Sequence, residues 1–179
     1  MTCPESRSWP RVAGLSLVCC GLVVAIALKI RPVSDESLAA LFTEERTSLD
    51  RLVSVLAGNP AISCVQRHAE SNDVLLATDN AGRWTPASAT VPAAGEVQRL
   101  FDQLGCDYAS RGASEITVAF RRNGIEDLHP GGCKVLAFCS AQPEFVVSSI
   151  DDFRRHNRGR YGCYRHLEGS WYIKYEQAH

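Results

Sequence analysis

The chain has 179 residues, of which 45% are hydrophobic and 22% are charged. These values are typical of a folded globular domain and exclude a chain too polar to offset its ordering entropy. After Arg31 there are 15 Lys and Arg against 19 Asp and Glu, a formal net charge of −4, which argues against nucleic-acid binding.

A hydrophobic segment lies near the N-terminus. The 17 residues from Val12 to Leu28 carry no charge, and basic residues flank them on both sides. This length is at the lower limit of a bilayer span, about 17 to 25 residues, and exceeds the usual apolar core of a signal peptide. We predict a short tail at residues 1–11, a transmembrane anchor at residues 12–30, and one extracytoplasmic, periplasmic domain at residues 34–179.

Other fates of this segment are open. Ala25 and Ala27 form an A-x-A triplet, and cleavage near Ala27 would release a secreted protein. A lipoprotein is a further alternative, although Val18 before Cys19 does not suit lipidation. A buried helix is the last alternative, but the segment is apolar all round, whereas a helix on a globular surface has one polar face.

The first helix of the domain is predicted directly after this segment. Ser34 can cap it, and Asp35 and Glu36 lie in its first turn, where negative charge is favourable. Apolar residues then recur every three or four positions up to Leu56, which is helical spacing. The Gly-Asn-Pro run at residues 58–60 ends the helix.

Short strands and a second helix follow. Strands are predicted at Ala61 to Arg67 and at Val74 to Thr78. Residues 80–95, rich in Ala, Pro, Ser and Thr, are predicted to form a flexible loop. A second helix is predicted around Ala93 to Leu104, with Gly105 as its C-terminal stop.

Further strands complete the domain. Glu115 to Arg122 alternates apolar and polar residues, and the Asn123-Gly124 pair after it is a hairpin signal. The other predicted strands are Cys133 to Cys139, Glu144 to Ser148, Tyr161 to His166 and Trp171 to Glu176. Because strands and helices do not alternate regularly, we predict an α+β fold: an antiparallel sheet with two helices on one face, preceded by an N-terminal transmembrane helix.

The domain contains five cysteines, which are Cys64, Cys106, Cys133, Cys139 and Cys163. None forms a C-x-x-C pair and no histidine has zinc-finger spacing, so no metal site is predicted. In an oxidising compartment we predict one or two disulfides. If Cys133 to Cys139 is one strand, its ends lie about 20 Å apart, and these two cysteines do not pair with each other.

A short motif at residues 129–132, His-Pro-Gly-Gly, resembles the haem-ligand box of the cytochrome b5 family. The resemblance implies that His129 and His156 would hold a haem iron. That family has helices around its box, whereas the sequence after residue 132 predicts a strand. We therefore predict a surface turn and no cofactor.

A basic stretch near the C-terminus is predicted to bind a partner. Its arginines could receive an acidic partner, an anionic head group or peptidoglycan; the alternative is a solvated loop balanced by Asp151 and Asp152. Trp171 could add an aromatic contact, or it could belong to the edge of the core. The predicted partner-binding residues are Arg154, Arg155, Arg158, Arg160, Tyr161, Arg165 and Trp171.

The C-terminal stretch from Tyr164 to Tyr175 resembles the endings of small uncharacterised exported bacterial proteins, which implies export. Common hydrolase, zincin and nucleotide-binding motifs do not occur. We predict a membrane-anchored extracytoplasmic binding domain without enzymatic activity, of an envelope-accessory or immunity type, whose partner is another envelope protein or a toxin. The alternatives are a small-molecule sensor or carrier with a pocket between sheet and helices, and an enzyme using Cys133 and His129.

Overall fold

The computed structural model describes residues 33–68, 71, 73–77, 84–86, 93–120, 133–157 and 162–176. The predicted membrane segment, Val12 to Leu28, lies outside these ranges, and so does the Asn123-Gly124 hairpin signal. Within the described ranges, no helix is both long enough and apolar enough to cross a membrane. The anchor therefore stays a prediction.

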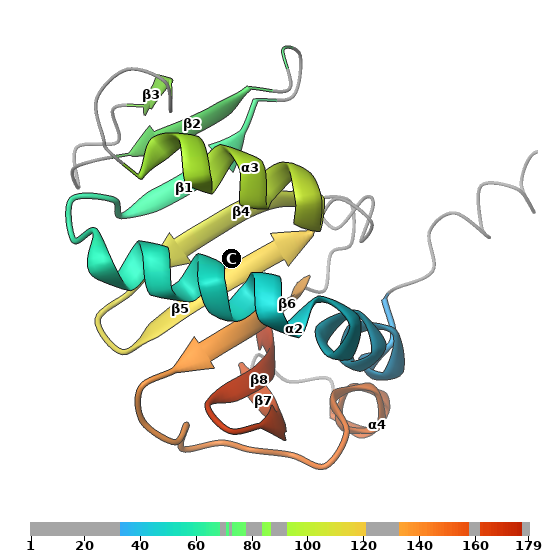
Figure 1. The fold of residues 1–179 in the computed structure, drawn as a ribbon. Helices are drawn as coiled ribbons and strands as arrows, with labels where there is room; N and C mark the ends of the chain where they lie inside the picture. The colour runs from blue at the N-terminus through green and yellow to red at the C-terminus, as the bar shows by residue number, and fades with distance from the viewer. Residues whose placement is uncertain are drawn as a thin grey trace, which may run out of the picture. The chain divides into compact units, whose positions relative to one another are not determined.

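Two long helices form where the sequence predicts them. Helix α2 is Asp35–Gly58, and the Oγ of Ser34 accepts a hydrogen bond from the backbone N–H of Ser37 at 3.1 Å. Helix α3 is Ala94–Leu104 and ends at Gly105, whose φ of 66° is the left-handed conformation that glycine adopts at low cost. Both helices pack on one face of a sheet (Figure 1), as the sequence predicts.

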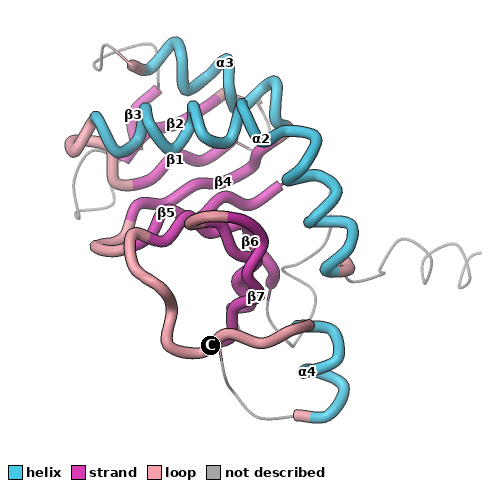
Figure 2. The backbone as a smooth tube through the Cα atoms, turned by 60° about the horizontal axis from the view of Figure 1, so that its bottom comes forward, coloured by secondary structure: helices cyan, strands magenta, loops and turns pink. Residues whose placement is uncertain are grey.

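The sheet is antiparallel, and its described strands follow the order β3-β2-β1-β4-β5-β6-β8-β7. Figure 2 shows these strands as one layer beneath α2 and α3, which confirms the α+β class. The strand bounds are β1 Cys64–Arg67, β2 Val74–Ala77, β3 Trp84–Pro86, β4 Cys106–Arg111, β5 Glu115–Phe120, β6 Cys133–Cys139, β7 Cys163–Glu168 and β8 Trp171–Glu176.

The core lies between this sheet and the two helices. Strand register brings one apolar residue from each of six neighbouring strands into a single row on the helix-facing side. Because alternate strand residues point to the same face, this row can be buried as a unit. Its members, each at most 1% exposed, are Leu76, Val65, Ala109, Val118, Leu136 and Ile173.

Some elements differ from the sequence-based prediction. Strand β4 was not predicted, and β3 lies inside the segment expected to be a loop. The basic stretch expected to be a loop begins with a helix, α4, at Ile150–His156. The strand predicted at Glu144 to Ser148 is reduced to a single parallel bridge between Val146 and Tyr164.

Candidate interaction surface

The predicted partner-binding residues are divided between α4, β7 and β8. Arg154 and Arg155 lie in the last turn of α4. Arg165 lies on β7 and points to the start of α2, where its Nη1 is 3.4 Å from carboxylate oxygens of Asp35 and Glu36. Trp171 lies on β8, and the other three predicted residues, Arg158, Arg160 and Tyr161, lie outside the described ranges.

Trp171 belongs to the core and does not form a contact surface. Its side chain is fully buried, its ring packs against the rings of Phe42 and Phe138, and its Nε1 donates a hydrogen bond to Asp50 at 2.8 Å. The reason is strand alternation, which places Trp171 and Ile173 together on the helix-facing side of β8. The prediction that Trp171 contacts a partner is therefore corrected: Trp171 is a core residue.

The two α4 arginines are held in different ways. The guanidinium of Arg154 lies over the ring of Tyr175, 4.6 Å from its centroid, so its position is fixed by a cation–π contact. Arg155 is 72% exposed and lies 3.4 Å from the carboxylate of Asp152, an exposed pair that contributes little to stability. Arg155 is therefore available for a contact with another molecule.

An exposed aromatic residue that the sequence analysis did not select lies beside α4. Phe145 is 44% exposed, and its ring meets that of Phe153 edge to face, with centroids 5.3 Å apart. Its carbonyl accepts the backbone N–H of Tyr164 at 2.9 Å, which fixes its segment along the outer edge of β7. We use the name α4 surface for Phe145, Phe153, Arg154 and Arg155.

A buried ionic network holds α4 in place. Asp35, at the start of α2, is fully buried and accepts a hydrogen bond from the backbone N–H of Ile150 at 2.7 Å. In return, Asp151 accepts the backbone N–H of Asp35 at 2.8 Å. Between them, the Nζ of Lys134 lies 2.7 Å from Asp35 and 2.5 Å from Asp151. The N-termini of α2 and α4 are thereby joined by charged side chains from α2, β6 and α4.

The charge state of this network follows from its contacts. Burial raises the pKa of Asp35, but the hydrogen bond and charge of Lys134, together with the N–H groups of Ile150 and Asp151, outweigh burial and lower that pKa. Asp35 is therefore ionised at neutral pH. Because Asp35 and Asp151 both contact the Lys134 ammonium, the network is structural and does not offer an uncompensated charge to a ligand.

A second ionic network lies on the sheet face turned away from α2 and α3, which no described helix covers. Glu115 accepts hydrogen bonds from the Lys174 ammonium and, at 3.0 Å, from the Tyr164 hydroxyl. Glu176 also contacts Lys174, at 2.6 Å. Burial and the bond to Glu115 raise the pKa of Tyr164 to about 12, so its phenol stays protonated at neutral pH. This network fastens β5 to β7 and β8.

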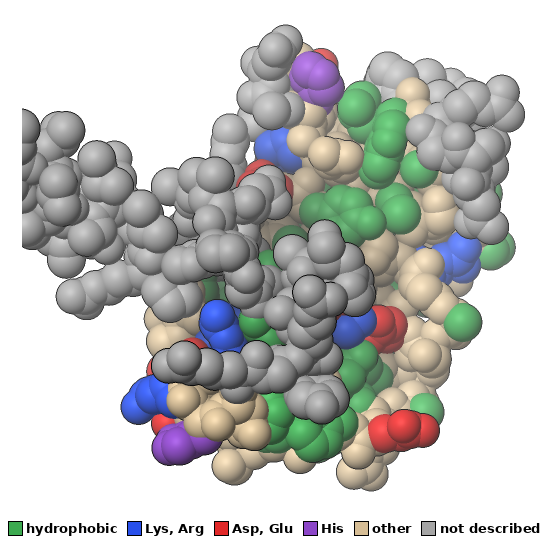
Figure 3. All heavy atoms as spheres, turned by 180° about the vertical axis from the view of Figure 1, so that it is seen from behind, with side chains coloured by type: hydrophobic (Ala, Val, Ile, Leu, Met, Phe, Trp, Pro, Cys, Tyr) green, Lys and Arg blue, Asp and Glu red, His purple; other side chains and the backbone are tan. Residues whose placement is uncertain are grey.

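The same face carries a small apolar cluster. Ala137, Cys139 and Tyr172 are buried there, with Tyr164 packed against them. Figure 3 views the molecule from this side and shows hydrophobic side chains next to charged ones on the described surface. Since Glu115, Lys174 and Glu176 on this face pair with one another, it is a less favourable place for a charged partner than the α4 surface.

The histidines give little support for the haem or nucleophile alternatives. His129 lies outside the described ranges, and His156 lies on α4 with its Nδ1 2.8 Å from the Asp152 carbonyl oxygen. The Nε2 of His166 is 3.0 Å from the Gly169 carbonyl oxygen. Among the described residues, no three His, Cys, Asp or Glu side chains gather in a way that could hold a metal ion.

The cysteines are placed on strands. Cys64, Cys106, Cys139 and Cys163 carry free thiols in the structure. Cys133 and Cys139 are the two ends of β6, as the sequence analysis expected. Within the described strands, the register does not put any two of these five residues opposite each other on neighbouring strands. The disulfides stay a prediction that this register does not support.

Comparison with protein families, curated proteins and solved structures gives no match for this chain. The functional inference therefore rests on the residues and their geometry.

Proposed function

We propose that this protein is a membrane-tethered, extracytoplasmic binding domain without enzymatic activity, and that it binds an acidic protein partner through the α4 surface. The observation that supports this proposal is the exposed ring of Phe145, which packs against Phe153 of α4, the helix that carries Arg154 and Arg155. Aromatic residues and arginine are the side chains most enriched in the energetically important parts of protein interfaces.

Exposure separates this surface from the rest of the described domain. The large hydrophobic residues exposed within the described ranges are Trp84, Phe145 and Val146; Phe145 packs against Phe153 of α4, and Val146 bridges to Tyr164 of β7. Trp84 lies on β3, at the opposite edge of the sheet from β7. An apolar centre with a polar rim is the usual arrangement of a protein interface, and here Arg154 and Arg155 supply positive charge near Phe145 and Phe153.

Rigidity also favours this surface. The network of Asp35, Lys134 and Asp151 fixes the start of α4, and Tyr175 holds Arg154. A surface whose side chains are already held loses less conformational entropy on binding than a mobile one.

The partner can be identified by site-specific photocross-linking in intact membranes. We expect a cross-linking amino acid at Phe145 to capture one protein, and the same amino acid at Trp84 to capture none. The purified partner should then lose affinity at least tenfold for Arg155→Glu, and its binding should weaken as salt rises because surface charges are screened. Arg99→Glu, an exposed arginine change on α3, is the matched control and should bind normally.

The proposal is contradicted if the cross-linker captures equally at Phe145 and Trp84, or if the affinity for the partner changes neither with Arg155→Glu nor with salt concentration.

The membrane tether is tested separately. A C-terminal alkaline phosphatase fusion should be active, because that enzyme folds only outside the cytoplasm. An inactive fusion in a cell that accumulates the protein would remove the extracytoplasmic location, whichever surface binds the partner.

A further inference from the structure

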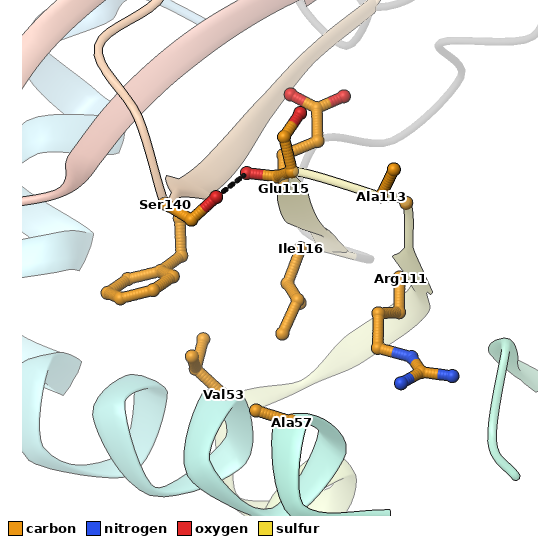
Figure 4. Close-up of a pocket in the computed structure, with 10 residues that line it drawn as sticks. Val53, Ala57, Arg111, Ala113, Glu115, Ile116 and Ser140 are labelled. Atoms are coloured by element: carbon orange, nitrogen blue, oxygen red, sulfur yellow. Dashed lines mark hydrogen bonds between the residues drawn. The ribbon is translucent and has the colours of Figure 1, made fainter. Parts of the chain in front are cut away.

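A cavity of about 260 Å³ lies far from α4, between the second half of α2 and the turn that joins β4 to β5. Figure 4 shows Val53 and Ala57 of α2 on one side and Ile116 of β5 on the other. Phe138 of β6 completes these apolar walls. The cavity is smaller than the roughly 300 to 1,000 Å³ of sites for drug-sized ligands, so it suits a small one.

Arg111 is the one cation among the described residues that line this apolar cavity. The guanidinium of Arg111, at the end of β4, donates a hydrogen bond from Nη2 to the Pro60 carbonyl oxygen. Its Nε is buried and has no hydrogen-bond partner. Among the described residues no carboxylate pairs with Arg111, although a buried N–H without a partner is costly.

Among the described residues, Glu115 is the one acidic residue that lines the cavity, and it does not neutralise Arg111. Its side chain points away from the cavity in Figure 4, toward the opposite face of the sheet. There its carboxylate is occupied by Lys174 and Tyr164. The cavity therefore combines apolar walls with one positive charge that has no described counter-ion.

We propose that this cavity binds a small carboxylate that carries an apolar tail. The tail packs against Val53, Ala57, Ile116 and Phe138, and the carboxylate pairs with the Arg111 guanidinium, which can donate two parallel hydrogen bonds to it. The volume corresponds to about nine groups of the size of a water molecule, each taking roughly 30 Å³. That size fits a short fatty acid or the C-terminal residue of a peptide, which present the same chemistry.

Titration of the full-length protein with hexanoate tests the proposal, with binding followed by calorimetry. We expect saturable binding of hexanoate and at least tenfold weaker binding of hexanol, which has the same tail without the charge. Arg111→Gln should weaken hexanoate binding at least tenfold, while Arg99→Gln, the matched surface change, should leave it unaltered. Ala57→Trp, which fills the cavity and keeps Arg111, should abolish binding.

The source of the carboxylate is tested by a second pair of ligands. A short peptide ending in a free leucine carboxylate that binds more tightly than hexanoate identifies a peptide terminus, whereas the reverse order identifies a free fatty acid. The same peptide with a C-terminal amide in place of the carboxylate is the control and should not bind. Equal affinity for hexanoate and hexanol, or unchanged hexanoate binding by a folded Arg111→Gln or Ala57→Trp variant, overturns the proposal.

Discussion

Asp35 and Asp151 each cap the helix to which the other belongs. The carboxylate of Asp35, on α2, accepts the backbone N–H groups of Ile150 and Asp151 at 2.7 and 3.3 Å, at the start of α4. The carboxylate of Asp151 accepts the backbone N–H of Asp35 at 2.8 Å. Because these residues are 116 positions apart, the first turn of the short α4 is held by a tertiary contact in addition to its local N-cap, Ser149.

Removal of the Asp35 carboxylate should therefore release α4. We expect Asp35→Ala to lower the free energy of unfolding by about 3 kcal/mol. This is the low end of the range for a broken buried ion pair, because Lys134 still forms an ion pair with Asp151 in the variant. Amide hydrogen exchange at Ile150 and Asp151 should accelerate. Asp152→Ala, on the exposed side of α4, is the control and should change stability by about 0.5 kcal/mol or less. Slow exchange in the Asp35→Ala variant would contradict this account of α4.

The same carboxylate predicts a pH dependence. Since the pKa of Asp35 is lower in the folded protein than the roughly 3.9 of an unfolded chain, its ionised form stabilises the fold. That contribution is complete above the unfolded pKa and is lost as the pH falls through the folded pKa. The stability difference between the native chain and Asp35→Asn, measured by urea unfolding, should therefore be largest near neutral pH and shrink in acid. A difference independent of pH would show that Asp35 is not held ionised.

The long helices could be predicted because their signals are local. The caps and apolar spacing of α2 and the C-terminal Gly105 of α3 lie within the helices or next to them. Strand β4 could not be predicted in this way, because a bulge between Cys106 and Tyr108 interrupts its alternation of buried and exposed residues. Helix α4 is only seven residues long, and besides its local N-cap, Ser149, its first turn is capped by Asp35 from a distant part of the chain.

The candidate sites depended even more on tertiary structure. The sequence shows that Arg154 and Arg155 are close together, but not that Phe145 lies exposed against Phe153 of the same helix. For Arg111, the sequence does not show that its guanidinium lines a cavity and lacks a carboxylate partner among the described residues. Trp171 was selected as an aromatic contact, and the sequence does not show that its indole is buried and bonded to Asp50, 121 positions away.

The buried position of Trp171 gives a prediction that separates the core from the surface. Trp171→Phe loses the hydrogen bond to Asp50 and part of its packing, so we expect a loss of about 2 kcal/mol in unfolding free energy. Capture of the partner through the α4 surface should be unchanged. Trp84→Phe, an exposed change on β3, should alter stability by about 0.5 kcal/mol or less. A Trp171→Phe variant that is as stable as the native protein but no longer binds the partner would show that Trp171 contacts the partner.

Alkylation rates test the buried thiols. Burial, followed by the nearby Glu115 charge, raises the pKa of Cys139 to about 11, and burial, followed by Asp35, raises that of Cys163 to about 11. At pH 8 each is then thiolate in only about one molecule in a thousand. In the folded protein, we expect iodoacetamide to modify the half-buried Cys64 at least tenfold faster than Cys139 or Cys163, as measured by mass spectrometry. In urea, the three cysteines should react at equal rates. Equal rates in the folded protein would contradict this burial. A cysteine that resists alkylation in urea until a reductant is added would instead show that the predicted disulfide forms.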